Sequence, residues 1–362
     1  MPNQFCRYLS NGYSFSISKG TTEVTPCCLF PIPIIADQSM IRNRQNLFEN
    51  INGWTDSCKT CKQLEDAGQQ SLRQSSFDWI SAEESSHEPI TIDINLDYEC
   101  NAACVICNKH SSSLWSKELS KLENNKTIII KKDDQAINRA IDQIISLVSL
   151  QRLKYVKFFG GEPLFTDTHL KFIKHIPHPE NVTLHYTTNG SVHPNQETLD
   201  AWAGFKTVIF AASLDGIEEQ FDYVRWPLPW SKVSENILRL RNNSDVWNVM
   251  FRIEFTVNFL NAYYYDRVEQ WVADNLATNL YGDATEINVH QCWAGIWDLD
   301  KMPEKMRQVV MQKYPKTHLI HQLVVNLPKP SDLEPWKKFV DTWDQRRNNS
   351  WKTAFPDLVD HL

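Results

Sequence analysis

The sequence lacks any long apolar run, and no stretch approaches the roughly 18 consecutive apolar residues of a membrane-spanning helix. It also lacks a basic excess: its net charge of −7 disfavours a nucleic-acid-binding protein, which usually carries a basic domain or stripe. The first residues, MPNQFCRYLSNG, do not join a charged segment to an apolar one, so no secretory signal is predicted. No internal repeat or low-complexity tract is evident. We therefore expect a cytoplasmic protein without a membrane or nucleic-acid partner.

Cysteine, by contrast, is abundant. The chain has nine cysteines among 362 residues, and eight of them lie in its first third. In a reducing cytosol, cysteines that cluster in this way are more often metal ligands or catalytic groups than disulfides. With 42% hydrophobic and 22% charged residues, the composition is that of a globular protein. The cysteines therefore predict metal binding.

Strand-like runs alternate with helix-like patterns after a polar, serine-rich segment that ends near residue 88. The expected strands are 90–96, 154–159, 182–187, 207–213, 251–258 and 286–292. The expected helices are 113–122, 136–150, 167–176, 195–205, 232–243 and 264–276. Strand alternating with helix predicts a parallel sheet, and six such units suit a partial barrel as well as a doubly wound sheet.

Polar and apolar side chains alternate on several of these strands, for example in FRIEFTVN (251–258). Helices must cover the apolar face, so the polar face of each strand is expected to look inward. The same alternation occurs in 90–96 and 286–292, which is more than one or two edge strands would explain.

Four strands run directly into distinctive segments. These are CNAACVIC (100–107), GGEPL (160–164), TTNG (187–190) and SLDG (213–216). In α/β barrels the active site is built from the loops at the carboxyl ends of the strands. We therefore expect these four segments to form one rim.

Cys100, Cys104 and Cys107 have the spacing C-x3-C-x2-C. A structural zinc takes four ligands, and His110 is a candidate for the fourth. A cubane iron–sulfur cluster held by three thiolates instead leaves one iron open to a substrate or cofactor. The spacing alone leaves both interpretations open.

This spacing, followed in order by GGEPL, TTNG and SLDG, resembles the radical S-adenosylmethionine (SAM) enzyme superfamily over about residues 90–295. The resemblance implies an α/β fold, a partial (β/α)6 TIM-like barrel. It also implies a [4Fe-4S] cluster whose open iron binds SAM, and whose reduction cleaves SAM to a 5′-deoxyadenosyl radical. Ile106 departs from the pattern, because many members have an aromatic residue before the third cysteine.

The resemblance also implies roles for individual residues. Cys100, Cys104 and Cys107 would be the cluster ligands. The implied SAM contacts are Gly160, Gly161, Glu162, Pro163, Thr188, Asn189, Ser213, Asp215 and Arg252.

The remaining N-terminal cysteines are Cys6, Cys27, Cys28, Cys58 and Cys61. They fit either a zinc site or a cluster. Their arrangement, with a hairpin-like run around Gly20, resembles the SPASM and twitch extensions, which bind auxiliary iron–sulfur clusters, although those usually follow the barrel. We expect a small N-terminal metal-binding region with a second [4Fe-4S] cluster. Its expected ligands are Cys6, Cys58, Cys61 and one of the adjacent pair Cys27 and Cys28.

Cys292 stands at the end of the last expected strand. It is either a buried core thiol, a hydrogen-atom donor to a substrate radical as in radical SAM peptide epimerases, or a ligand or substrate contact. The expected domains are 1–88 (auxiliary cluster and linker), 89–300 (barrel) and 301–362 (a helical extension packing on the barrel).

The resemblance implies an enzyme that modifies a peptide or protein by crosslinking, oxidation or epimerisation. Its partners would be that substrate and an external electron donor of the flavodoxin or ferredoxin kind. Two alternatives stay open: a radical SAM enzyme acting on a small molecule such as a sugar or nucleoside, and a zinc-binding interaction protein without catalysis.

Overall fold

A computed structural model of the chain describes residues 4–39, 48, 50–66, 68, 70–80, 88–124, 132–292, 294–328 and 332–362. Its strands are β1 (Gly12–Ser18), β2 (Thr21–Thr25), β3 (Ile34–Ile35), β4 (Thr91–Asn95), β5 (Tyr155–Phe158), β6 (Thr183–Thr188), β7 (Thr207–Ser213), β8 (Val249–Val257) and β9 (Glu286–Gln291). Its α-helices are α1 (Tyr8–Asn11), α3 (Lys59–Asp66), α4 (Leu72–Trp79), α5 (Ser113–Leu122), α6 (Asp134–Leu147), α7 (Thr168–Ile173), α8 (Gln196–Trp202), α9 (Glu218–Val224), α10 (Trp230–Arg241), α11 (Tyr265–Asn275), α12 (Glu304–Lys313), α13 (Leu319–Val325), α14 (Glu334–Arg347) and α15 (Trp351–Ala354).

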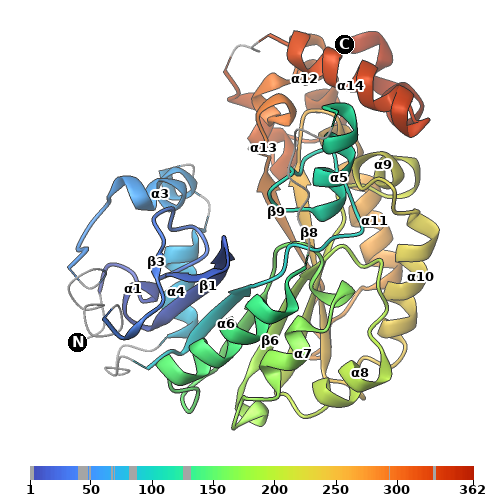
Figure 1. Cartoon of the computed structure of the whole chain (residues 1–362). Helices are drawn as coiled ribbons and strands as arrows, with labels where there is room; N and C mark the ends of the chain where they lie inside the picture. The colour runs from blue at the N-terminus through green and yellow to red at the C-terminus, as the bar shows by residue number, and fades with distance from the viewer. Residues whose placement is uncertain are drawn as a thin grey trace. The chain divides into compact units, whose positions relative to one another are not determined.

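The strands are hydrogen-bonded in the order β3-β2-β1-β4-β5-β6-β7-β8-β9. The pairs β4–β5, β5–β6 and β8–β9 are parallel, and helices separate successive strands from β4 onward (Figure 1). This α/β order confirms the predicted fold class, a partial (β/α)6 TIM-like barrel. Each of the six strands expected from the sequence is present, with its ends within two residues of the expected ones.

The N-terminal region contributes strands to the same sheet. β1 pairs in parallel with β4, and β2 pairs antiparallel with both β1 and β3. The hairpin-like run is thus the β1–β2 hairpin, whose turn residues Lys19 and Gly20 have φ values of 49° and 79°. Two successive positive φ values are what a tight type I′ turn requires.

The chain divides into two compact units. The first unit comprises Met1–Tyr98, Lys131–Tyr186 and Asn195–Ile209. The second unit comprises Glu99–Ile130, Thr187–Pro194 and Phe210–Leu362. The domains expected from the sequence are three consecutive segments, whereas each compact unit combines segments that are far apart in the chain. The expected domain boundaries stay predictions.

The first unit buries one apolar strand face completely. On β4, β5 and β6 this face consists of residues that are at most 2% exposed: Ile92, Ile94, Val156, Phe158 and Leu184. Helices α6 and α7 lie along this part of the sheet (Figure 1). The buried positions of α6 recur at helical spacing, as its amphipathic pattern predicts: Ala136, Ile137, Ala140, Ile141 and Ile144.

The opposite face of these strands is polar and also enclosed. Strand register places Ser14, Asp93, Lys157 and His185 side by side across β1, β4, β5 and β6. Asp93 and His185 are only 6% and 3% exposed. The polar face of β4 therefore lies inside the protein, as its alternating pattern predicts.

In the second unit, β8 shows the expected alternation, with Phe251, Ile253, Phe255 and Val257 buried and the polar residues between them half-buried. β9 differs from the expectation. It stands at the end of the sheet with one hydrogen-bonded neighbour, and His290 on its polar face is exposed. An edge strand is covered less than a central one, which explains the difference.

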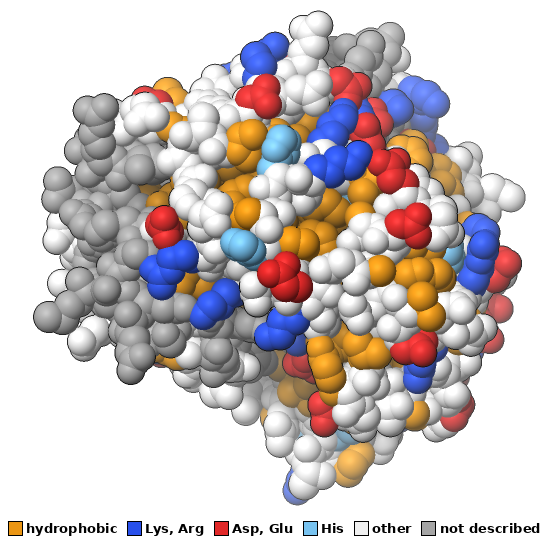
Figure 2. Space-filling view, turned by 90° about the horizontal axis from the view of Figure 1, so that it is seen from below, with side chains coloured by type: hydrophobic (Ala, Val, Ile, Leu, Met, Phe, Trp, Pro, Cys, Tyr) orange, Lys and Arg blue, Asp and Glu red, His pale blue; other side chains and the backbone are white. Residues whose placement is uncertain are grey.

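The surface carries charges of both signs. On the face shown in Figure 2, lysine and arginine side chains lie among aspartates and glutamates, with apolar side chains between them. Among the described residues, no helix has both the length and the apolar character needed to cross a bilayer.

Candidate functional site

The cysteine loop, residues 100–107, is anchored at the start of α5. The hydroxyl of Ser113 accepts the N–H of Cys100 at 3.1 Å. The indole N–H of Trp115 donates to the carbonyl oxygen of Cys104 at 2.7 Å. The first turn of α5 therefore holds the loop through the loop's backbone atoms.

The last residue of α9 and the segment that follows it hold the other side of the loop. The N–H of Ala103 donates to the carbonyl of Trp226 at 2.7 Å, and that of Val105 to Val224 at 2.9 Å. These two bonds involve only backbone atoms, whereas those from α5 use side chains of the helix. The loop is thus fixed between two helices that are about 100 residues apart in the sequence.

Arg225 lies between these two bonds and reaches the loop with its side chain. Its Nη1 is 3.9 Å from Cys104 Sγ, and its Nη2 is 2.5 Å from Asp215 Oδ2. Asp215 is fully buried, and its Oδ1 accepts the N–H of Thr256 at 2.8 Å. Asp215 of the SLDG segment thus acts on the loop through Arg225, which sequence reasoning missed.

Burial sets the protonation of these groups. It raises the pKa of Cys104, which the charge of Arg225 opposes, and it raises the pKa of Cys107 to about 11. Burial likewise raises the pKa of Asp215, against the pull of Arg225. Without a metal group the thiols of Cys104 and Cys107 hold their protons, so metal binding to them releases protons.

The TTNG segment bonds to the same loop. The side-chain amide of Asn189 donates to Asn101 Oδ1 at 3.0 Å, and Asn101 Nδ2 donates to Ser191 Oγ at 2.9 Å. Thr188 Oγ1 accepts the N–H of Gly190 at 3.1 Å, which shapes the turn. The structure therefore brings Asn189 next to the cysteine loop and gives Thr188 a local role in the turn.

The GGEPL segment lies in the first unit, directly after β5. Gly160 and Gly161 have φ values of 82° and 47°, and a β-carbon on Gly160 would lie 1.9 Å from Asn95 Oδ1. Glu162 is 2% exposed, and its Oε1 accepts the N–H of Leu164 at 3.1 Å, so it caps the short turn that contains Pro163. Glycine is needed at position 160 for conformation and for space.

Three further predicted residues lie in the second unit. Ser213 ends β7 and is buried. Arg252 on β8 pairs with Glu286 on β9 at 2.7 Å. Cys292 follows β9 and is 1% exposed, its N–H donates to Val257 O at 2.8 Å, and burial raises its pKa to about 12. A protonated, buried thiol suits both the core and the hydrogen-donor interpretations of Cys292.

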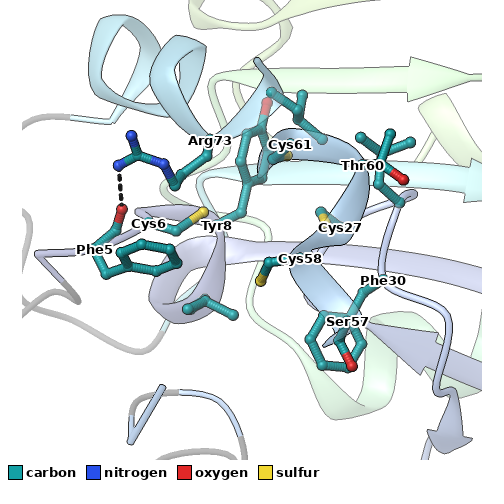
Figure 3. Close-up of a pocket in the computed structure, with 13 residues that line it drawn as sticks. Phe5, Cys6, Tyr8, Cys27, Phe30, Ser57, Cys58, Thr60, Cys61 and Arg73 are labelled. Atoms are coloured by element: carbon teal, nitrogen blue, oxygen red, sulfur yellow. Dashed lines mark hydrogen bonds between the residues drawn. The ribbon is translucent and has the colours of Figure 1, made fainter. Parts of the chain in front are cut away.

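A second cysteine group lines a pocket in the first unit, with about 420 Å³ of empty space. Four sulfur atoms surround this hollow in Figure 3, and they come from Cys6, Cys27, Cys58 and Cys61. Cys6 precedes α1, Cys27 follows β2, and the C-x2-C pair spans η2 (Asp56–Cys58) and α3. We call this group the four-cysteine pocket.

Cys28 has a different environment from its neighbour. It does not line the pocket, and its thiol hydrogen-bonds to buried Asp93 on β4. Burial, with Asp93 adding to it, raises the pKa of Cys28 to about 12. Adjacent side chains thus point to different neighbours, and Cys27 is the one beside the other three cysteines.

An ion pair frames the four-cysteine pocket. Arg73 on α4 donates from Nε and Nη2 to both carboxylate oxygens of Glu65 on α3, at 2.9 and 2.6 Å. Its Nη1 donates to the carbonyl of Phe5 at 2.9 Å, the dashed line in Figure 3. This bidentate pair ties α3 and α4 to the N-terminal segment that carries Cys6.

The cysteine loop and the four-cysteine pocket both offer thiols, the side chains that ligate iron–sulfur clusters. Among the described residues, no three His, Cys, Asp or Glu side chains lie close enough together to hold a single metal ion. A cubane cluster places several irons between its thiolates, so the sulfurs need not meet at one point.

Beside Gly160, the buried Asn95 Oδ1 accepts no hydrogen bond from any described residue. That acceptor fits a ligand with an N–H donor, such as an amino group.

Sequence comparison finds a partial relative. The chain is 25% identical over 183 residues to a "Probable GTP 3',8-cyclase" from Thermococcus kodakarensis, a match covering 45% of this chain and 52% of that protein. The chain thus spans about half the length of this curated relative. No family model matches the chain.

Two solved structures are similar in part. Native anSMEcpe with bound AdoMet has a TM-score of 0.41 at 15% identity, covering 72% of this chain and 62% of that chain. Streptococcus suis SuiB bound to precursor peptide SuiA has a TM-score of 0.37 at 12% identity, covering 88% and 63%. Likenesses this low carry no argument about the function of this chain. The radical SAM superfamily and the SPASM or twitch placement therefore stay predictions from the sequence motifs.

Proposed function

We propose that this chain is a radical SAM enzyme that modifies a peptide or protein. The observation that carries the proposal is the cysteine loop, in which three thiols are presented by a backbone bonded to α5 and to the segment after α9. A cluster bound by Cys100, Cys104 and Cys107 would have one open iron, which in radical SAM enzymes binds SAM and supports its reductive cleavage to a 5′-deoxyadenosyl radical.

The chain's own residues have separate tasks in this proposal. Asp215 orients Arg225, whose guanidinium lies beside Cys104 and offsets thiolate charge in a buried setting. Asn189 holds Asn101 within the loop. Asn95 and the backbone at Gly160 offer hydrogen-bonding groups to the amino end of SAM.

The four-cysteine pocket supports an auxiliary [4Fe-4S] cluster with Cys6, Cys27, Cys58 and Cys61 as ligands. Such a cluster would supply an electron acceptor, which an oxidative modification of a peptide requires. This is why we favour a peptide or protein over a small molecule. The small-molecule alternative is favoured by one observation, the name of the curated relative, a GTP cyclase.

The test is reductive SAM cleavage by the anaerobically reconstituted protein. Cys100→Ala should abolish 5′-deoxyadenosine formation, since two thiolates do not retain the cluster. Cys28→Ala is the matched control, because Cys28 lies outside both proposed ligand sets, and it should cleave SAM at the wild-type rate. Wild-type 5′-deoxyadenosine formation by Cys100→Ala would contradict the proposal.

A further inference from the structure

A cage of three indole rings surrounds Arg347, the last residue of α14. The guanidinium carbon lies 4.6 Å from the ring centre of Trp226, 4.8 Å from Trp115 and 5.0 Å from Trp343. The Arg347 side chain is only 3% exposed. Indole faces attract cations, so the cage stabilises a guanidinium that has left water.

The charge of Arg347 is only partly balanced. Its Nη2 lies 2.9 Å from Glu118 Oε2, and the Glu118 side chain is 16% exposed. The buried Nε and Nη1 of Arg347 have no hydrogen-bond partner among the described residues. A guanidinium does not lose its proton at any physiological pH, so this positive charge is permanent.

The cage is built directly on the cysteine loop. Trp115 donates its indole N–H to the carbonyl of Cys104, and the carbonyl of Trp226 accepts the N–H of Ala103. Cys107 packs against the buried cluster of Ala103, Trp115 and Trp343. Helix α14 thus brings a permanent buried charge to the loop that carries the three thiols.

We propose that Arg347 is a positioning residue that raises the reduction potential of the cluster held by the cysteine loop, a role that rests on the proposed function. One-electron reduction makes a cluster and its thiolates one unit more negative. A nearby cation in a low-dielectric setting favours that reduced form, and net charge is among the factors that set cluster potentials. The electron comes from a low-potential reductant, dithionite in the test.

The test is an EPR-monitored redox titration of the reconstituted full-length protein. The loop cluster is identified by the change of its signal when SAM is added. Arg347→Gln removes the charge, and we expect its midpoint potential to fall by about 59 mV, a tenfold change in the one-electron equilibrium. Glu118→Gln removes the balancing carboxylate and should move the potential upward.

Arg346→Gln is the matched control, because Arg346 is the adjacent arginine and is exposed. It should leave the potential unchanged, and Arg347→Lys should recover part of the loss because it keeps a cation. If Arg347→Gln does not fold, Glu118→Gln decides. An unchanged potential in both variants, or shifts of both in one direction, would overturn the role of Arg347. A wild-type protein that binds no iron at the loop would contradict the proposed function itself.

Discussion

Gly160 illustrates how one residue joins conformation to binding. Its φ of 82° is costly for any other residue, and Asn95 fills the space that a side chain would need. Asn95 in turn is the acceptor that we assign to the amino end of SAM. A substitution of Gly160 is therefore expected to lower both the stability of the protein and its affinity for SAM.

We expect Gly160→Ala to lower the free energy of unfolding by about 1–3 kcal/mol, the cost of a strained backbone conformation. SAM binding should weaken in the same variant. Gly204→Ala is the matched control, because the nearest atom to its new β-carbon would lie at an ordinary 3.5 Å. Urea unfolding and equilibrium dialysis with SAM measure the two effects, and a Gly160→Ala protein with wild-type stability would contradict this account.

His169 on α7 is a buried titratable group that makes the stability of the fold depend on pH. It is 3% exposed, its Nδ1 lies 3.1 Å from the hydroxyl of Tyr186 on β6, and burial lowers its pKa to about 3. In the unfolded chain a histidine has a pKa of about 6.5, so below that pH the unfolded state binds the extra proton. Stability contributed by neutral His169 is therefore present above pH 6.5 and is lost as the pH falls toward 3.

The expected cost of acidification through His169 is roughly 2 kcal/mol at pH 5 relative to pH 7. His169→Gln removes the titration and keeps a hydrogen-bonding side chain, so its stability should depend less on pH over this interval. Urea unfolding of both proteins at pH 7 and pH 5 measures the difference. Equal pH dependence of the two proteins would show that His169 is not the group responsible.

At the scale of the whole molecule, the two cysteine groups lie in different units, the cysteine loop in the second and the four-cysteine pocket in the first. If both hold cubane clusters, reconstituted protein should contain about eight irons and eight sulfides per chain. Changing Cys100, Cys104 and Cys107 together to Ala should leave about four. Changing Cys58 and Cys61 to Ala should also leave about four.

Iron and acid-labile sulfide content measures this stoichiometry, with Cys28→Ala as the control that should retain about eight irons. About four irons in the wild type and none in the triple variant would show that the protein has no auxiliary cluster. That outcome would weaken the peptide-oxidation proposal and leave the radical SAM proposal intact.

Local sequence predicted the elements well where their patterns are complete. Helix α5 occupies the expected residues 113–122, and β7 the expected 207–213. The pattern of 286–292 correctly predicts a strand, but it wrongly predicts that the polar side chains of this strand face the interior. A sequence pattern does not reveal which strand of a sheet lacks a second neighbour. The adjacent pair Cys27 and Cys28 could not be separated from sequence either, since their difference lies in contacts with distant residues.

The fold class and the C-x3-C-x2-C loop could be predicted from the sequence alone, because strand and helix periodicity and metal-ligand spacing are local properties of the chain. The charges that surround that loop, by contrast, depend on how distant segments pack together. Arg225 and Arg347 are about 120 and 240 residues from Cys104, and no periodicity or motif marks them. They reach the loop because α9 and α14 pack within the same unit, and burial there gives their charges an effect that they would not have in water.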